Sequence, residues 1–388
     1  MRLCMVYNAD MGLANGRYYV DRAYGRYVES LLPYVEEVVL CNPVATLPTA
    51  INGLLLAPPK VSVRPLPYYS RWTESYRTIP RAIPVLRHAI LQSDLIYVRI
   101  PSPLASVAFI LARLHRKPVL LHIVGDQRQA YDASRYRGVT GGLAHLIVEF
   151  NEWSTQRMVN RAVTIVQGEE LAQKHQRTGN CMFNLIESPI SADDVIQRVP
   201  TIGARPLRLI YVGSLLEKKG VNDLLQALPI LNAAGIECHL EIIGSGRELM
   251  ALYNWVERAR MGKIVTFLGT IHPEGELFRH LRRADICVMP SRSEGVPRVI
   301  LESMAAGAAV VATRVGGIPG LVRDGQNGLL IQPGAPSEIA QAILRLAREP
   351  LLFERLVQKG RETALLYTRE KHAASLFEII SAQLSLRS

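Results

Sequence analysis

Short apolar runs alternate along the chain with longer segments of mixed polarity. In the first half, the apolar runs predict strands and the mixed segments between them predict helices. The predicted strands are Leu3–Tyr7, Glu37–Cys41, Asp94–Ile100, Pro118–Val124 and Ala162–Gln167, and the predicted helices span about 17–32, 103–115 and 142–160. Short apolar strands that alternate with helices indicate a parallel sheet covered on both faces.

The same alternation returns after residue 206, and a chain of 388 residues suits two domains better than one. Proline and glycine at positions 200, 203 and 206 punctuate a linker. We therefore predict a first domain at 1–195, a linker at 196–206, a second domain at 207–366 and a terminal helix at 367–388. Further strands are predicted to begin at Leu207, Glu241, Ile264, Ala284 and Val310, and further helices at about 274, 297, 336, 351 and 369.

The first predicted strand is followed by a loop, Asn8–Gly16, that contains Gly12 and Gly16. Parallel sheets of this type bind ligands at the carboxyl ends of their strands, and this loop lies at such an end. Its glycines would let the backbone approach a ligand, or would simply make a turn.

The chain carries a formal net charge of +11, most of it in the first part. Residues 1–140 contain 17 lysines and arginines against 9 aspartates and glutamates. Such an excess favours an anionic partner: nucleic acid, a membrane surface or an acidic substrate, although a merely basic surface explains it equally well. No basic run with interleaved aromatics resembles a nucleic-acid module, so we expect no nucleic-acid partner.

Cysteine usage and the apolar runs indicate a cytoplasmic protein. The five cysteines are scattered, so reduced core thiols are expected rather than disulfides or a metal site. The chain starts directly with a predicted strand and not with a signal peptide. Its longest apolar run, around Leu104–Leu111, is too short to span a bilayer.

Aromatic and basic residues are mixed between Pro65 and Arg87. They are Tyr68, Tyr69, Trp72 and Tyr76 with Arg71, Arg77, Arg81 and Arg87. This mixture suits contact with lipid headgroups or with a polyanionic acceptor. An ordinary basic loop with a few packed aromatics explains it as well. Four prolines in the segment argue against one long amphipathic helix.

The stretch Ser293–Gly307 holds the most informative residues. It follows a predicted buried strand and opens a helix, with Pro297 as the first helical residue and Gly307 as the stop. The free N–H groups of this helix start, those of Arg298 and Val299, are suited to phosphate. Glu294 and Glu302 would flank such a ligand, because five helical residues span roughly 7–8 Å. A surface ion pair with Arg298 explains Glu302 equally well.

The residues that follow change the balance. They are the predicted strand Val310–Thr313, the turn Gly316-Gly317-Ile318-Pro319 and the segment Asp324–Leu330. Together with the two glutamates, this block closely resembles glycosyltransferase family 4, the retaining nucleotide-sugar transferases of GT-B fold. The specific motifs lie within about 207–330, and the first half of the chain matches only in layout.

The resemblance implies an α/β protein with two Rossmann-like domains that face a central cleft, and a terminal helix that crosses back to the first domain. It implies a retaining hexosyltransferase-type enzyme that moves a sugar from a nucleotide diphosphate sugar to a hydroxyl acceptor. The second domain would hold the donor. The first would hold the acceptor, which we expect to be lipid-linked or a growing saccharide at the inner membrane face, with a small soluble acceptor as the rival.

The resemblance also assigns roles to residues of the second domain. Lys219, in the Lys-Gly pair of the family pattern, would neutralise the diphosphate, Glu294 would hold sugar hydroxyls and Glu302 the ribose hydroxyls. Ser214 stands where the family usually has arginine, so Lys218 or a basic residue of the first domain would supply the second cation. The other expected contacts of the donor are Gly213, Gly244, Thr270, Gly295, Val296, Arg298 and Val299.

In the first domain, the family commonly has a histidine before the glycine that ends the strand at 118–124. Val124 takes that position here, and His122 lies two residues earlier, on the same face of the strand. His122 is therefore a weaker catalytic candidate, and a core histidine is the plainer interpretation. Asp126, in the following loop, would take over a polar role.

Two other functions stay open. The chain has no Asp-x-Asp motif of the kind that metal-dependent transferases use, so neither metal nor cofactor is expected. The altered positions Ser214 and Val124 leave room for a non-catalytic subunit that binds nucleotide sugar. An epimerase or hydrolase of nucleotide sugars on the same fold is the other alternative.

Overall fold

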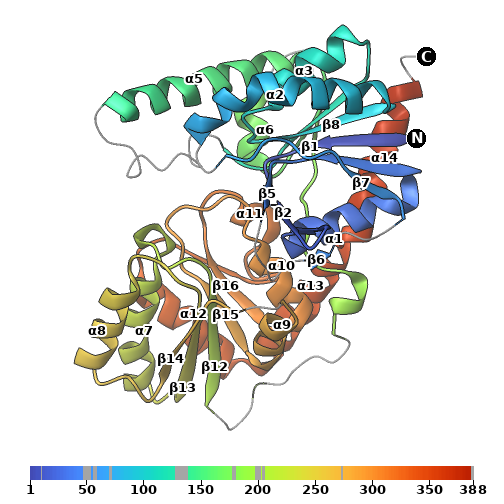
Figure 1. Ribbon diagram of the computed structural model, residues 1–388. Helices are drawn as coiled ribbons and strands as arrows, with labels where there is room; N and C mark the ends of the chain where they lie inside the picture. Colours follow the sequence, from blue (N-terminus) through green and yellow to red (C-terminus); the bar gives the residue numbers. More distant parts are fainter. Residues whose placement is uncertain are drawn as a thin grey trace. The chain divides into compact units, whose positions relative to one another are not determined.

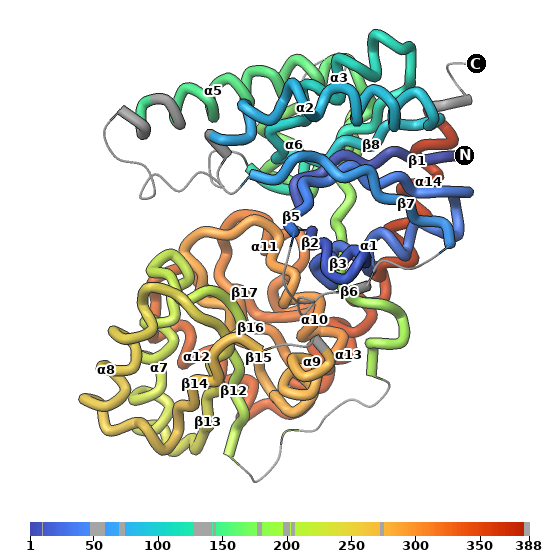
Figure 2. The backbone as a smooth tube through the Cα atoms, viewed as in Figure 1, coloured from blue at the N-terminus to red at the C-terminus, as the bar shows by residue number. Residues whose placement is uncertain are grey.

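The computed structural model describes residues 1–9, 11–46, 54–55, 59–69, 72–126, 139–176, 181–196, 202, 206–271 and 274–385. The chain forms two compact units (Figures 1 and 2). The first contains Met1–Glu187 together with His372–Ser388, and the second contains Ser188–Lys371. The terminal residues thus return to the first unit. The sequence-based boundaries at 195, 206 and 366 remain predictions.

A seven-stranded parallel sheet forms the centre of the first unit, with the strand order β11-β10-β9-β8-β1-β4-β7. β1 pairs on one side with β4 and on the other with β8, so that Leu3 lies between Val38 and Leu95. The strands are β1 (Arg2–Val6), β4 (Glu37–Cys41), β7 (Val61–Val63), β8 (Leu95–Ile100), β9 (Val119–Ile123), β10 (Val163–Val166) and β11 (Met182–Asn184).

Helices cover both faces of this sheet (Figure 1). The helices α2 (Trp72–Leu91), α3 (Ala105–Leu114) and α5 (Val139–Val159) pack on one face. The helices α1 (Arg22–Leu31) and α14 (Arg369–Ser385) pack on the other. α6 (Glu169–His175) connects β10 to β11. Every residue of β8 and β9 is buried because both faces of the sheet are covered.

A second, small sheet corrects the prediction for residues 8–32. β2 (Met11–Ala14) and β3 (Arg17–Val20) form a hairpin, and they are flanked by β5 (Val44–Thr46) and β6 (Leu54–Leu55). Asn15 and Gly16 form the turn with φ of 51° and 71°, the conformation that a two-residue hairpin requires. The helix predicted from Arg17 begins only at Arg22, where the Asp21 carboxylate caps it.

α2 is a second correction, because the prolines between Pro65 and Arg87 do not prevent one long helix. α2 has 20 residues and contains Pro80 and Pro84. Both prolines lie on the exposed side, while the opposite side is buried against α3 and the sheet. Burial of that apolar side outweighs the loss of two helical hydrogen bonds, each proline costing about 3 kcal/mol.

The second unit has a six-stranded parallel sheet with the order β14-β13-β12-β15-β16-β17. Its strands are β12 (Leu207–Val212), β13 (Cys238–Ile243), β14 (Val265–Gly269), β15 (Ile286–Met289), β16 (Ala309–Thr313) and β17 (Leu329–Ile331). Its helices are α7 (Val221–Ala233), α8 (Leu249–Arg258), α9 (Glu274–Arg283), α10 (Arg298–Ala306), α11 (Ile318–Leu321), α12 (Pro336–Arg348) and α13 (Pro350–Leu366). The prediction of two parallel α/β sheets is confirmed.

Candidate functional site

The candidate residues of the second unit gather where the strand order reverses. β12 is central, the chain adds β13 and β14 on one side of it, and β15, β16 and β17 lie on the other. The loops that leave β12 and β15 therefore diverge, and open α/β sheets bind their ligands at such a point. We call the loops after β12, β13, β14 and β15, with the start of α10, the switch-point site.

Lys219 and Glu294 meet at this site. The Lys219 Nζ lies 2.5 Å from Glu294 Oε1, and the Ser291 hydroxyl donates to the same oxygen at 3.0 Å. Their side chains are only 17% and 10% exposed. The two residues are 75 positions apart in sequence, and the structure brings them together. A half-buried ammonium thus lies beside a half-buried carboxylate.

The backbone holds these two loops in close contact. Gly220 has φ of 66°, and a Cβ there would overlap the carbonyl oxygen of Pro290. Glycine is therefore required both by the left-handed conformation and by the close approach. The Arg292 N–H donates to the Lys218 carbonyl at 2.8 Å, which joins the loops a second time.

An ion pair without any local signal in the sequence strengthens this junction. The Arg292 guanidinium donates to both carboxylate oxygens of Asp223, at 3.1 and 2.8 Å. Asp223 lies in the first turn of α7 and is 5% exposed, so its charge would be costly to bury alone. Arg292 follows β15, so the pair fixes the start of α7 relative to the loop that carries Glu294.

The predicted glycine turns pack on one another. A Cβ at Gly244, whose φ is 137°, would overlap the carbonyl oxygen of Gly213. The Leu215 N–H donates to the Ser245 carbonyl at 2.9 Å, and the Thr270 hydroxyl donates to the Ser245 hydroxyl at 3.2 Å. Gly213, Gly244 and Thr270 are thus brought to one edge by the turns after three neighbouring strands. This packing explains the glycines without a ligand.

Tyr211, which was not a candidate from the sequence, contacts the same edge. Its hydroxyl donates to the Ser214 carbonyl at 3.0 Å. Burial raises the pKa of Tyr211, and the Glu294 carboxylate raises it further. Tyr211 therefore stays neutral and keeps its donor, while the Ser214 side chain is exposed at the site.

The start of α10 faces this site with free backbone donors. Pro297 is the N-cap with φ of −74° and ψ of 116°, so the helix begins at Arg298 and not, as predicted, at Pro297. Among the described residues, no side chain caps this end, and the helix stops at Gly307 with φ of 82°, as predicted. The Gly317 N–H donates to the Gly295 carbonyl at 2.9 Å and holds the preceding loop. The N-terminal end of the helix dipole favours an anion there.

Glu302 lies on α10, between buried residues on either side, and is half-buried. Burial raises the pKa of the neighbouring Cys287 thiol to about 12, and the Glu302 carboxylate contributes to that rise. Val296, the remaining candidate of this loop, is half-buried against Gly317.

In the first unit, the structure places His122 in the core. It is 0% exposed, and its Nδ1 lies 2.5 Å from the Tyr97 hydroxyl. Burial lowers the pKa of His122, and the nearby Arg99 guanidinium lowers it further. Arg99 in turn pairs with Glu187 at 2.6 Å. Contact with a sugar would need an exposed side chain, so the core interpretation fits this geometry better.

The other first-unit candidates have local partners. Asp126 is 16% exposed and accepts from the Lys174 ammonium at 2.9 Å, which also pairs with Glu152. Gly12 lies within β2, and Gly16 forms the hairpin turn with open space around it. The turn interpretation therefore accounts for Gly16.

Two of the aromatic residues between Pro65 and Arg87 pack inside the first unit. The Tyr69 hydroxyl donates to Asn8 at 2.7 Å, and the Tyr76 hydroxyl donates to Asn151 at 2.9 Å. Tyr68 is exposed, as are Arg77, Arg81 and Arg87 on α2. Arg71 and the Trp72 side chain lie outside the described residues.

The described residues contain no group of three or more His, Cys, Asp and Glu side chains placed to hold a metal ion. Among the described helices, none combines the length and apolarity needed to cross a bilayer.

The sequence of the second unit matches a known protein family. Residues 206–349 match the family model described as "Glycosyl transferases group 1". An uncharacterized glycosyltransferase of Methanocaldococcus jannaschii is 33% identical over 162 residues, which are 42% of this chain and 44% of that protein. Glycogen synthase of Mycobacterium tuberculosis is 28% identical over 270 residues, which are 66% of this chain and 61% of that protein. The match thus spans about half the length of these curated relatives.

Among solved structures, the whole chain resembles HepE of Anabaena in complex with UDP-glucose. The TM-score is 0.70 at 16% identity, and the alignment covers 98% of this chain and 100% of that chain. At this identity the likeness establishes a shared fold.

Proposed function

We propose that the chain is a group 1 glycosyltransferase of GT-B fold that transfers a sugar from a nucleotide diphosphate sugar to a hydroxyl acceptor, with retention of anomeric configuration. The match of residues 206–349 to the family model supports this proposal. The observation that carries this proposal is the pairing of Lys219 with Glu294 at the switch point of the second sheet. The Lys219 ammonium is suited to the diphosphate, and the Glu294 carboxylate is suited to the hydroxyls of the sugar.

Departure of the nucleotide diphosphate leaves negative charge that must be stabilised. Lys219 supplies one full charge, and the N–H groups of Arg298 and Val299 supply the dipole of α10. In this proposal the acceptor oxygen bonds to the anomeric carbon on the face from which the phosphate leaves. The acceptor proton passes to the departing phosphate oxygen, so that no protein nucleophile takes part.

The Lys219–Glu294 ion pair has a consequence for binding. In the free protein each charge neutralises the other, and the Ser291 hydroxyl adds a donor to Glu294. An incoming diphosphate competes for Lys219, while sugar hydroxyls replace the donors that Glu294 loses. In this proposal, the ion pair holds both charged groups at the positions where they would contact the donor. Glu302 would hold the ribose hydroxyls.

We also propose a donor and a metal requirement. A structural neighbour is described in complex with UDP-glucose, so we propose a UDP-hexose as the first donor to test. Since Lys219 and the helix N-terminus supply positive charge, we propose that transfer needs no metal and stays unchanged in EDTA.

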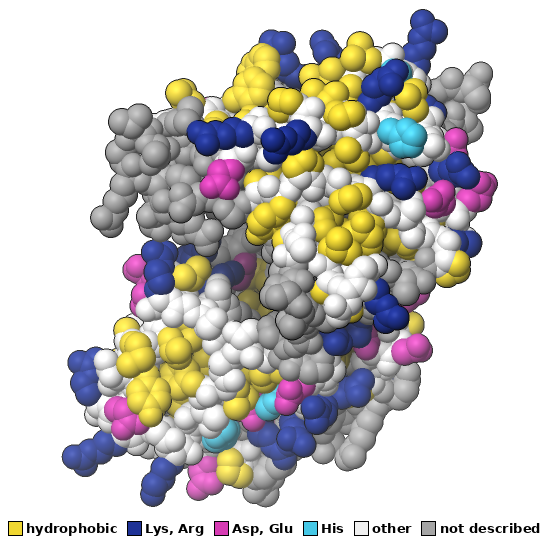
Figure 3. Space-filling view, viewed as in Figure 1, with side chains coloured by type: hydrophobic (Ala, Val, Ile, Leu, Met, Phe, Trp, Pro, Cys, Tyr) yellow, Lys and Arg dark blue, Asp and Glu magenta, His cyan; other side chains and the backbone are white. Residues whose placement is uncertain are grey.

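We propose a saccharide or lipid-linked acceptor, in polysaccharide, lipopolysaccharide or glycolipid biosynthesis. One aligned relative is a glycogen synthase. We propose that transfer takes place at the cytoplasmic side of a membrane, and a surface of the first unit is suited to peripheral contact there. This surface, the outer helical face, is the solvent side of α2, α3 and α5 (Figure 3).

The outer helical face combines exposed apolar residues with basic ones. Trp153 on α5 is 51% exposed, packs against Phe150, and lies under the Arg157 guanidinium at 4.0 Å. The exposed apolar residues are Ile83, Leu91, Ile110, Leu114, Leu146, Phe150 and Trp153, and the exposed arginines are Arg77, Arg81, Arg87, Arg113, Arg116 and Arg157. Aromatic and aliphatic side chains among arginines suit an anionic lipid surface.

The test is the release of nucleoside diphosphate from a panel of UDP-, GDP- and ADP-hexoses, with and without oligosaccharide acceptors. We expect release from one nucleotide family, faster with acceptor, and a product with the anomeric configuration of the donor by proton NMR. Release from none of the donors would favour the non-catalytic subunit. A changed sugar without acceptor would favour an epimerase.

A further inference from the structure

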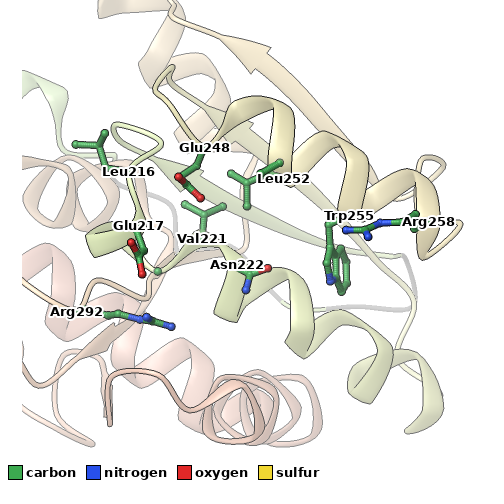
Figure 4. A pocket seen from close by; sticks show the side chains of 11 residues that line it. Leu216, Glu217, Val221, Asn222, Glu248, Leu252, Trp255, Arg258 and Arg292 are labelled. Carbon is green, nitrogen blue, oxygen red and sulfur yellow. The ribbon is translucent and has the colours of Figure 1, made fainter.

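A pocket of the second unit lies beside the switch-point site and is lined in part by residues of the same loops, among them Glu217, Glu248 and Arg292. It is bounded by α7, α8 and the short turn Glu217–Lys219 (Figure 4), and its volume is about 330 Å³. Glu217 and Arg292 lie at one end, and Trp255 and Arg258 at the other. Pockets of roughly 300–1,000 Å³ are usual for small-molecule ligands. We call it the α7–α8 pocket.

The α7–α8 pocket shares loops with the switch-point site but is not lined by the candidate donor residues of that site. Gly220 lines the pocket, whereas Lys219, Glu294 and Glu302 do not. Glu217 turns into the pocket two residues before Lys219 turns toward Glu294. A ligand in the pocket would therefore contact the loop that carries Lys219 without occupying the place of the nucleotide.

The residues around the pocket present both a flat apolar surface and oxygen acceptors. The Trp255 indole and Leu252 come from α8, with Val221 of α7 opposite. Glu217 and Glu248 offer carboxylate oxygens, and the Asn222 amide both donates and accepts. A sugar ring has the matching surfaces: an apolar C–H face for the indole and a rim of hydroxyls for the carboxylates and the amide.

The charges of the pocket argue against an anionic ligand. Arg292 is engaged by Asp223 through two hydrogen bonds, so its charge is largely neutralised. Glu217 and Glu248 then outweigh Arg258, the remaining basic residue of the lining. A phosphate or a nucleotide would meet net negative charge here, whereas an uncharged saccharide would not.

We propose that the α7–α8 pocket binds a neutral segment of a saccharide, apart from the reacting end of the acceptor. This inference rests on the proposed function, because a transferase that extends a glycan would bind that glycan more tightly with a second binding site for it. Stacking on Trp255 supplies the affinity, and the carboxylates and Asn222 select for hydroxyls.

The experiment measures binding of maltoheptaose, cellohexaose, mannohexaose and chitohexaose to the full chain by isothermal titration and by the fluorescence of tryptophan. We expect at least one to bind the wild type with a millimolar or lower Kd. Trp255→Ala should weaken that binding at least about tenfold, the loss of roughly 1.4 kcal/mol. Asn222→Ala changes an exposed side chain and should weaken it severalfold without affecting folding.

Tyr253→Ala is the matched control, because Tyr253 is an exposed aromatic residue of α8 that does not line the pocket. It should leave saccharide binding unchanged. Lys219→Ala should also leave it unchanged, and Trp255→Ala should leave nucleotide binding unchanged. These two variants distinguish the pocket proposal from the proposed function, because each binding site is then tested independently of the other.

Three results would overturn the proposal. They are no binding of any of the four oligosaccharides, binding that persists in both Trp255→Ala and Asn222→Ala, and binding that is lost in Lys219→Ala. Binding of UDP that depends on Trp255 and not on Lys219 would assign the pocket to a nucleotide instead.

Discussion

The Lys219 ammonium and the Glu294 carboxylate lie 2.5 Å apart, at the point where the strand order of the second sheet reverses. Each comes from a loop that follows a central strand, and neither is more than 17% exposed. The pairing brings two groups that are 75 positions apart in sequence to one place, where we propose that they bind the donor. It also makes the lysine the most direct target for substitution.

We predict that Lys219→Ala lowers kcat/KM for transfer at least about tenfold. The loss of one charged contact to the departing diphosphate removes roughly 1.4 kcal/mol or more of transition-state stabilisation. Lys263→Ala, which removes an exposed lysine of the same unit, should leave the rate unchanged. Steady-state rates near those of the wild type in Lys219→Ala would rule out this role.

Glu302→Ala is predicted to reduce transfer by a similar factor, at least about tenfold. The reason differs, because Glu302 is proposed to accept from ribose hydroxyls rather than to meet developing charge. Nucleoside diphosphate alone should therefore bind more weakly to the variant, which calorimetry can measure. Glu362→Ala, on the exposed side of α13, is the control. Equal affinity of wild type and Glu302→Ala for the nucleotide would remove Glu302 from the site.

Gly220→Ala and Gly235→Ala form a matched pair of substitutions. Both glycines have positive φ, 66° and 79°, but only at Gly220 would a Cβ overlap another backbone segment, at Pro290. We expect Gly235→Ala to lose about 1 kcal/mol of unfolding free energy, and Gly220→Ala to lose more and to impair transfer. Urea unfolding and rates measure both effects. Equal stability of the two variants would show that the contact of the two loops is adaptable.

The buried His122 predicts a pH dependence of stability. Burial, Arg99 and His372 lower its folded pKa below the ordinary value near 6.5. The unfolded chain then binds the proton more readily, so stability is full above pH 6.5 and falls as the pH drops below it. We expect His122→Gln to show a smaller loss of unfolding free energy between pH 7 and pH 5.5. Parallel pH profiles of the two proteins would contradict a neutral buried His122.

Charge reversal of Arg77, Arg81 and Arg87 tests the outer helical face. The three arginines are exposed on α2, so their replacement by glutamate should abolish co-sedimentation with vesicles that contain anionic lipid. Reversal of Arg258, Arg260 and Arg282, which are exposed in the second unit, makes the same change in net charge and should have little effect. Sedimentation that follows net charge alone would argue against a specific surface.

The sequence was sufficient for the two parallel sheets, because short apolar runs are local signals. It also singled out Lys219 and Glu294 as candidates, and the structure places these two in contact. The sequence-based prediction was wrong at Arg17–Val20, where a helix was expected. The Asn15-Gly16 pair is a hairpin signal, and these residues form the turn between β2 and β3. The prediction was also wrong at α2, since local proline penalties do not reveal how much apolar surface the tertiary fold buries.

The pairing of Arg292 with Asp223 had no local signal, because its members are 69 positions apart. The same holds for His122, whose burial depends on Tyr97, Arg99 and the returning helix α14. Long-range contacts of this kind decide which polar residues face a ligand and which serve the core.

The measurement that tests the central claim most directly is a thermal-shift series with UDP, GDP and ADP, without metal and then with magnesium. A ligand that binds only the native state raises Tm by mass action. We predict a clear rise with one nucleotide, independent of magnesium and lost in both Lys219→Ala and Glu302→Ala. No rise with any nucleotide, or a rise that both variants retain, would contradict a donor site at the switch point.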